Sequence, residues 1–148
     1  MLFRSATLKG FFGRVSDEQV TYVNAPQLAK QYGLELREQK SMVSADFVNL
    51  VTVRGAGHSI AGSLVGRRSD QRIVMIDDHR FDVPPAEHMV MVKNDDRPGV
   101  IGTVGTVLGN AGINIADMDV GRAAEAGTAV MLIAATAEVP DAVVDALR

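Results

Sequence analysis

The chain has 148 residues, of which 47% are apolar and only 5% aromatic, so a buried core must be built from aliphatic side chains. Its net charge of −3, without a long run of like charges, argues against a nucleic-acid clamp or a basic membrane-surface patch. Cysteine is absent, which excludes disulfides, thiolate metal sites and cysteine nucleophiles.

No targeting or membrane-spanning segment is visible in the sequence. The first residues, MLFRSATLKGFFGRV, lack the apolar region and cleavage site of a signal peptide. No apolar run approaches the ~20 residues of a membrane span. We therefore expect a cytoplasmic protein that binds neither a membrane nor a nucleic acid.

The first elements expected along the chain are a strand and a helix. The apolar residues of EQVTYVNAP (18–26) favour a strand. A helix is predicted over 24–33, with Asn24 as its N-cap and Gly33 at its end, because Pro26 suits a first helical turn.

Strands then follow one another up to the middle of the chain. The segment 46–55 alternates apolar side chains on both faces and is predicted to be a strand buried on both. Further strands are predicted at 58–66 and 72–83, and Asp77 with Asp78 is expected to turn the second of these into a hairpin.

The charge and two prolines divide the chain. Residues 1–87 carry 11 basic and 10 acidic groups, whereas residues 88–148 carry 4 basic and 8 acidic groups. Pro84 and Pro85 cannot continue a helix or a central strand. We therefore predict two domains, at 1–87 and 88–148.

The second domain shows the clearer pattern. Its expected elements are a strand at 88–94, a helix at 98–112 capped by Asp96 or Arg97, strands at 113–122 and 128–137 joined by a turn at 123–127, and a helix that begins at Pro140. This order is that of a ferredoxin-like β-α-β-β-α-β domain without its last strand. The fold class is therefore α+β, and we expect a chain that is a piece of a longer protein, lacking sequence before residue 1 and after residue 148.

The turn before the 98–112 helix is the main candidate site. Helix N-terminal amides around Pro98 and Gly99 would bind an anion such as a carboxylate. Asp96 would accept a hydrogen bond from an ammonium group, and Asn94 and Asn114 are expected to lie nearby. This set suits an amino acid, although Asp96 could simply cap the helix and the asparagines could simply make turns.

Three glycines of the same helix, Gly102, Gly105 and Gly109, fall on one face. Small residues on that face would allow close packing either on the sheet of the same domain or on a twin helix of a dimer. The spacing does not choose between the two.

Other candidate sites are weaker. Arg72 and Arg80 could hold a phosphorylated or carboxylated metabolite, although solvated strand ends explain them equally well. RGAGHSIAG (54–62) does not match a nucleotide-binding loop. The histidines lack metal-ligand spacing, and no nucleophile elbow or other catalytic constellation is present. We expect no catalytic residue, no metal and no cofactor in this chain.

Two stretches resemble known domains. HMVMVKNDDRPGVIGTVGTVLGNAGINIADM is similar to the ACT domain, a small ferredoxin-like module that binds amino acids. The upstream VTYVNAPQLAKQYGLELREQKS and DFVNLVTV resemble the intervening, mixed-sheet substrate-binding domain of long bacterial D-3-phosphoglycerate dehydrogenases. The resemblance covers about residues 8–148.

This resemblance implies the regulatory part of an NAD-dependent enzyme of serine biosynthesis, whose catalytic core would precede residue 1. It implies L-serine as an inhibitor bound between two ACT domains, and a homotetramer for the full-length enzyme. The matching positions are Asn94 and Asp96, the backbone of Pro98, Gly99 and Val100, and Asn114; Arg72 and Arg80 resemble contacts to a phosphate or substrate effector.

Two alternatives stay open at this point. Iron–sulfur L-serine dehydratases join a similar domain to an ACT module, so this chain could be a subunit or piece of one. It could also be a dimerisation module that binds no ligand.

Overall fold

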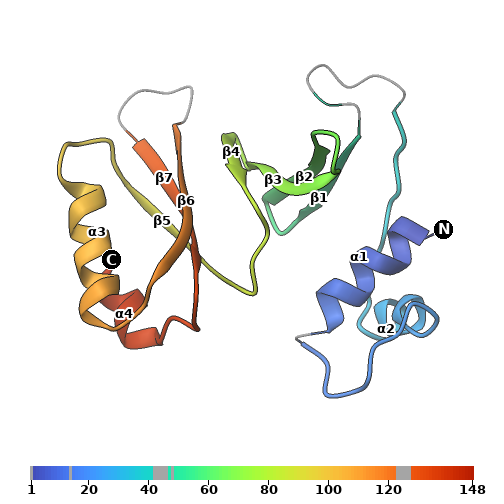
Figure 1. Ribbon diagram of the computed structural model, residues 1–148. Helices are drawn as coiled ribbons and strands as arrows, with labels where there is room; N and C mark the ends of the chain where they lie inside the picture. The colour runs from blue at the N-terminus through green and yellow to red at the C-terminus, as the bar shows by residue number, and fades with distance from the viewer. Residues whose placement is uncertain (1, 14, 42–46, 48, 123–127) are drawn as a thin grey trace. The chain divides into compact units, whose positions relative to one another are not determined.

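A computed structural model describes residues 2–13, 15–41, 47, 49–122 and 128–148 (Figure 1). Contacts divide the chain into two compact units, Met1–Val43 and Ser44–Arg148, which we name the helical unit and the sheet unit. The predicted division at residue 87 is a different one, and it stays a prediction.

The described residues of the helical unit form two helices, α1 (Leu2–Phe12) and α2 (Ala25–Gln31). They pack through a small apolar core formed by Leu8, Phe12, Ala25, Leu28 and Ala29. The predicted helix is confirmed, with Pro26 in its first turn and Gly33, at φ +68°, just beyond its end. α1 was not predicted, because its apolar residues were considered only as a possible leader.

The predicted strand within 18–26 is wrong, because these residues make a turn instead. The Asn24 side-chain oxygen accepts hydrogen bonds from the Thr21 amide (2.7 Å) and hydroxyl (3.0 Å). The Asn24 side-chain nitrogen donates to the Gln19 carbonyl oxygen at 3.0 Å. Such local side-chain bonds stabilise a turn against a strand. They also occupy the Asn24 side chain, which makes no N-cap hydrogen bond to α2.

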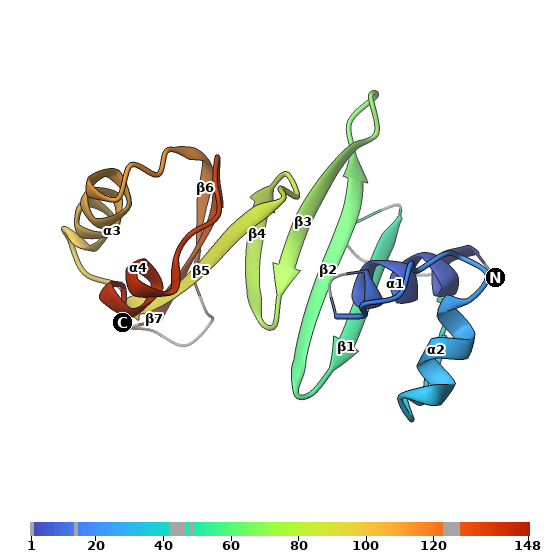
Figure 2. The ribbon, with the colours of Figure 1, turned by 90° about the horizontal axis from the view of Figure 1, so that it is seen from below.

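The sheet unit begins with a four-stranded antiparallel sheet in which neighbours in sequence are neighbours in space (Figure 2). Its strands are β1 (Leu50–Gly55), β2 (His58–Val65), β3 (Asp70–Ile76) and β4 (His79–Val83). The hairpin turn at Asp77 and Asp78 is confirmed, since Ile76 pairs with His79 across it. All its pairings are antiparallel, where the resemblance implied a mixed sheet.

The expectation that 46–55 is buried on both faces is wrong for the six residues of β1, which are all exposed. β1 is an edge strand of its sheet. Residues 42–46 and 48 lie outside the described part, so the start of the predicted strand is not included.

The second sheet of this unit has the strand order β5-β7-β6, again antiparallel. The strands of this sheet and the helices between and after them are, in chain order, β5 (His88–Asp95), α3 (Val100–Asn110), β6 (Ile115–Arg122), β7 (Thr128–Ala135) and α4 (Asp141–Ala146). The predicted order β-α-β-β-α is confirmed. The turn predicted at 123–127 lies outside the described residues.

The central strand β7 is buried on both faces because alternate side chains enter two different cores. Met131 and Ile133 join the helix-side core, in which Val104 and Leu108 of α3 lie. Val130, Leu132 and Ala134 join a second core with side chains of the four-stranded sheet: Ile73, Phe81 and Val83. The three-stranded sheet is therefore covered by helices on one face and by β3 and β4 on the other.

Candidate functional site

The candidate amino-acid site begins at the end of β5. Asn94 lies two residues after Val92, which packs in the helix-side core, so strand alternation places Asn94 on that same face. Its side-chain nitrogen donates to the Asp95 carbonyl oxygen at 2.7 Å. Its side-chain oxygen is buried and has no hydrogen-bond partner among the described residues.

An unpaired acceptor of this kind costs free energy, about 1–3 kcal/mol where a buried group goes unsatisfied. Buried polar atoms in native proteins are nearly always paired with protein, water or ligand. The Asn94 oxygen is therefore placed to accept a hydrogen bond from a group that the chain itself does not supply.

The turn that follows β5 exposes its charged residues. Asp95 and Arg97 form an ion pair of 2.6 Å, and the Arg97 amide donates to the Asp95 carbonyl oxygen at 2.8 Å. Asp96 is exposed. The N-cap residue of α3 is Gly99, with φ +92°, and not Asp96 or Arg97, so that prediction is wrong.

The N-terminus of α3 is open to an anion. It has no side-chain cap hydrogen bond and no acidic residue in its first turn. The first amides of a helix have no acceptor within the helix, and the helix dipole favours negative charge there. A carboxylate can therefore bind at the amides that follow Gly99, close in sequence to Asn94.

Asn114 does not join this group within one chain. Asn94 pairs with Ala129 at one end of β7, whereas Ile115, next to Asn114, pairs with Ala135 at the other end. Six residues of strand separate the two levels, about 20 Å at 3.3 Å per residue. The expectation that the two asparagines are neighbours in one domain is wrong, because the helix between parallel strands carries the chain back to the opposite end.

Asn114 is nevertheless well placed for an outside partner. Its side chain is exposed, while its carbonyl oxygen accepts from the Thr136 amide at 3.0 Å. β6 is an edge strand of the three-stranded sheet. On α3, a Cβ added to Gly102, Gly105 or Gly109 would meet no atom within 4 Å, so these glycines do not serve close packing inside the chain.

The two arginines of the first sheet lie on its face opposite the shared core. Arg72 on β3 is half-buried, with its Nε 3.6 Å from a carboxylate oxygen of Asp82. Arg80 on β4 is exposed and, two residues from Asp82, shares its face. A hollow of about 520 Å³ is lined by Ser69, Asp70, Gln71, Arg72, Pro84 and Pro85. Arg72 therefore borders a space, and Arg80 is not among the residues lining it.

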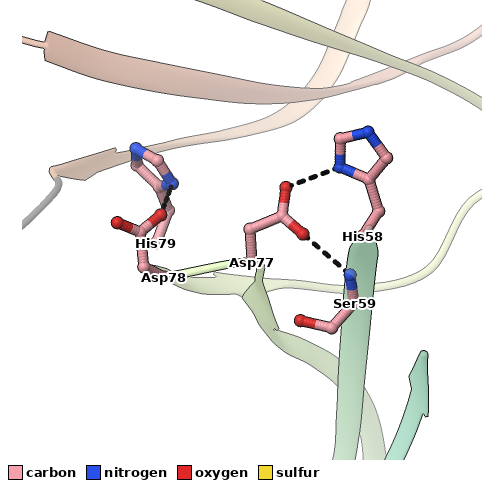
Figure 3. Close-up of polar contacts among 5 residues, drawn as sticks. All are labelled: His58, Ser59, Asp77, Asp78 and His79. Carbon is pink, nitrogen blue, oxygen red and sulfur yellow. Dashed lines mark hydrogen bonds and ion pairs between the residues drawn. The ribbon is translucent and has the colours of Figure 1, made fainter. Parts of the chain in front are cut away.

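A polar cluster that the sequence did not predict joins two hairpin ends (Figure 3). The Asp77 carboxylate contacts the His58 Nδ1 at 3.0 Å and accepts from the Ser59 amide at 2.7 Å. These two bonds, the first most strongly, lower the pKa of Asp77 below its ordinary 3.8. His79 Nδ1 lies 2.8 Å from Asp78.

The cluster clamps the β1–β2 turn to the β3–β4 turn. Asp77 also donates its amide to the Ser59 carbonyl oxygen at 2.8 Å and adopts φ +52°. His58 and His79 stand at the starts of β2 and β4. In the described ranges, no three His, Asp or Glu side chains form a group that could hold a metal ion.

No helix in the described part of the chain is long and apolar enough to cross a bilayer. Two family models match the chain: the D-3-phosphoglycerate dehydrogenase intervening domain over residues 1–77 and the ACT domain over residues 88–148.

Curated relatives agree with the family models. D-3-phosphoglycerate dehydrogenase of Mycobacterium tuberculosis is 34% identical over 145 residues, which covers 95% of this chain and 28% of the relative. The enzyme of Synechocystis is 34% identical over 92% of this chain and 25% of its own length. That of Bacillus subtilis is 33% identical over 96% and 28%. This chain thus spans about a quarter of the relatives it matches, and it belongs to the D-3-phosphoglycerate dehydrogenase family, of which it carries the intervening and ACT domains.

Proposed function

We propose that this chain is a regulatory part of an NAD-dependent D-3-phosphoglycerate dehydrogenase and binds L-serine for feedback inhibition. The observation that carries the proposal is the buried side-chain oxygen of Asn94, unpaired among the described residues and close in sequence to the N-terminus of α3, whose N-cap residue Gly99 makes no side-chain cap hydrogen bond. Together they offer an acceptor for an ammonium group and donors for a carboxylate, which are the two charged groups of an amino acid.

The ligand's carboxylate meets the backbone around Pro98, Gly99 and Val100, where Gly99 and Val100 carry the N–H groups and Pro98 has none. Its ammonium group donates to Asn94, with Asp96 adding negative charge at the mouth of the site. These contacts all come from one copy of the chain. The positive φ of Gly99 supports this arrangement, because a glycine there lets the backbone approach a ligand closely.

Asn114 completes the site from a second copy. A two-fold axis beside β6 would set two such strands antiparallel, and the start of one would meet the end of the other. The end of β6 lies at the Asn94 level of the sheet, since Arg122 pairs with Ala129 as Asn94 does. Symmetry therefore brings the partner's Asn114 to the end where it is needed, and the open glycine face of α3 leaves room for a partner.

Arg72 is proposed to hold a phosphate or a phosphorylated substrate effector. The hollow beside Arg72 and the half-buried guanidinium support this role. Arg80 contributes charge on the same face without lining the hollow. Both arginines share that face with Asp82, whose carboxylate a bound anion must displace or tolerate.

Calorimetric titration of the full-length enzyme with L-serine tests the amino-acid site. Asn114→Ala is expected to weaken binding by about 1–3 kcal/mol, because a polar ligand group loses its partner. Gln39→Ala is the matched control, since it removes an exposed amide in the helical unit. Unchanged affinity in Asn114→Ala would count against the site, and no serine binding by the wild type would favour a ligand-free dimerisation module.

Inorganic phosphate is the probe for the second site. Arg72→Gln is expected to weaken phosphate binding by about 1.5–3 kcal/mol, the range for hydrogen bonds to charged groups. Arg68→Gln removes an exposed arginine from the adjacent turn and is expected to bind as the wild type does. Equal affinities for all three proteins would remove Arg72 from the proposal.

A further inference from the structure

The two sheets meet at a contact between β4 and β6 that leaves no room for a side chain. A Cβ added to Gly121 would lie 2.8 Å from two ring carbons of Phe81 and 2.9 Å from the Arg80 carbonyl oxygen. Real Cβ atoms do not approach backbone this closely, so only glycine fits at position 121 with β4 in this place. The glycine fixes where β4 lies on the three-stranded sheet.

A hydrogen bond next to the close contact at Gly121 also joins β4 to β6. The Asp82 amide donates to one carboxylate oxygen of Asp119 at 2.7 Å. The other oxygen of Asp119 accepts from the Val120 amide at 2.7 Å, which orients the carboxylate. Each carboxylate oxygen of Asp119 thus accepts a hydrogen bond from a main-chain amide, one on β4 and one on β6.

Asp82 also connects this contact to Arg72. Its amide bonds to Asp119, while its carboxylate lies 3.6 Å from the Arg72 Nε. β6, at its other end, leads back to Asn114. A continuous set of contacts therefore runs from the proposed phosphate site through β4 to β6, the strand that begins directly after Asn114.

We propose that Gly121 and Asp119 are positioning residues that couple the proposed phosphate site to the proposed amino-acid site. The inference rests on the proposed function and adds how its two sites affect each other. Phosphate at Arg72 competes with the Asp82 carboxylate, Asp82 shifts, and Asp119 passes this shift to β6. Because ligand linkage is reciprocal, serine must change phosphate affinity by the same factor.

The test measures phosphate affinity of the full-length enzyme by calorimetry, with and without saturating L-serine. The wild type is expected to show a change of at least about fivefold, the lower end of typical couplings. Asp119→Ala is expected to bind each ligand alone as the wild type does and to lose the change. Asp117→Ala is the control, since Asp117 bonds the next amide of β6 in the same way. It is expected to keep the coupling.

Independent binding of the two ligands in the wild type would overturn the inference, and so would an equal loss of coupling in Asp117→Ala. A second experiment needs no ligand. It can therefore test the coupling even if the proposed function, the binding of serine and phosphate, is wrong. Hydrogen exchange of the Asp82 amide is compared in Arg72→Gln, Asp119→Ala and the double variant. Non-additive changes in protection support the link, whereas additive changes overturn it even if neither ligand binds.

Discussion

Asn94 and Asn114 stand at opposite ends of the three-stranded sheet: Asn94 pairs with Ala129, whereas Ile115, next to Asn114, pairs with Ala135, six positions further along β7. One copy of the chain therefore cannot bring both amides to one small ligand. If both contribute to a serine site, each site must take Asn94 from one copy and Asn114 from another.

This geometry predicts that two variants, each deficient in serine binding, restore binding when they are mixed. Asn94→Ala and Asn114→Ala are each expected to lose high-affinity serine binding in symmetric dimers. In a refolded equal mixture, mixed dimers hold one site with both asparagines, so about one quarter of the sites should recover. Calorimetric stoichiometry measures this fraction. A mixture that binds no better than the separate variants would show that the two asparagines do not share a site formed by two copies.

The unpaired oxygen of Asn94 predicts an effect on binding without an effect on folding. Asn94→Ala is expected to weaken serine binding by about 1–3 kcal/mol. The free energy of unfolding should hardly change, because removing an oxygen that has no partner among the described residues offsets the lost hydrogen bond from the Asn94 side-chain nitrogen to the Asp95 carbonyl oxygen. Asn49→Ala should show the reverse. Its side-chain oxygen accepts from the Leu64 amide at 2.9 Å and supports the first sheet. Calorimetry and urea unfolding followed by circular dichroism give the two quantities; a strong loss of stability in Asn94→Ala would contradict the assignment.

The close contact at Gly121 predicts that a single methyl group destabilises the sheet unit. Gly121→Ala is expected to cost about 1–3 kcal/mol, the usual range for overpacking. Gly109→Ala is the matched control: its Cβ would meet open space, and alanine in a helix gains up to about 1 kcal/mol over glycine. Urea unfolding midpoints compare the two. Equal midpoints would show that β4 moves freely against β6.

The clamp at Asp77 predicts an acid-sensitive contact between two turns. Hydrogen bonds from His58 and Ser59 favour the charged carboxylate, so the pKa of Asp77 lies below 3.8. A carboxyl group with a lowered pKa in the folded state stabilises the fold above pH 3.8, and this contribution is lost as the pH falls through the lower value. Carbon-13 titration of the Asp77 carboxyl measures the pKa, which should rise toward 3.8 in His58→Gln. No difference between the two proteins would exclude His58 as the main cause.

The sequence predicted the second sheet well because local pattern and tertiary burial agree there. The apolar run at 128–137 predicts a strand, which is confirmed as β7, and its residues alternate between two cores. The helix start was placed about two residues early, since Pro98 and Asp96 are good cap signals but Gly99 has the conformation that begins α3.

Failures in the first half come from interactions that pattern does not show. Thr21 and Asn24 form a turn through side-chain hydrogen bonds. The apolar residues around Tyr22, from which a strand was predicted, give no sign of these bonds. β1 has the composition of a buried strand but lies at a sheet edge. For the proposed site, residue types make Asn94 a candidate, whereas its separation from Asn114 depends on the direction in which α3 returns the chain.

Since β7 contributes to both cores, the ACT segment keeps the face that its helices cover but loses the cover of its other face once β3 and β4 are removed. An excised 88–148 segment would present Val130, Leu132 and Ala134 to water, an apolar stripe prone to self-association. Expression of that segment alone should therefore give an aggregating product, and a version that starts ahead of β3 should stay monodisperse.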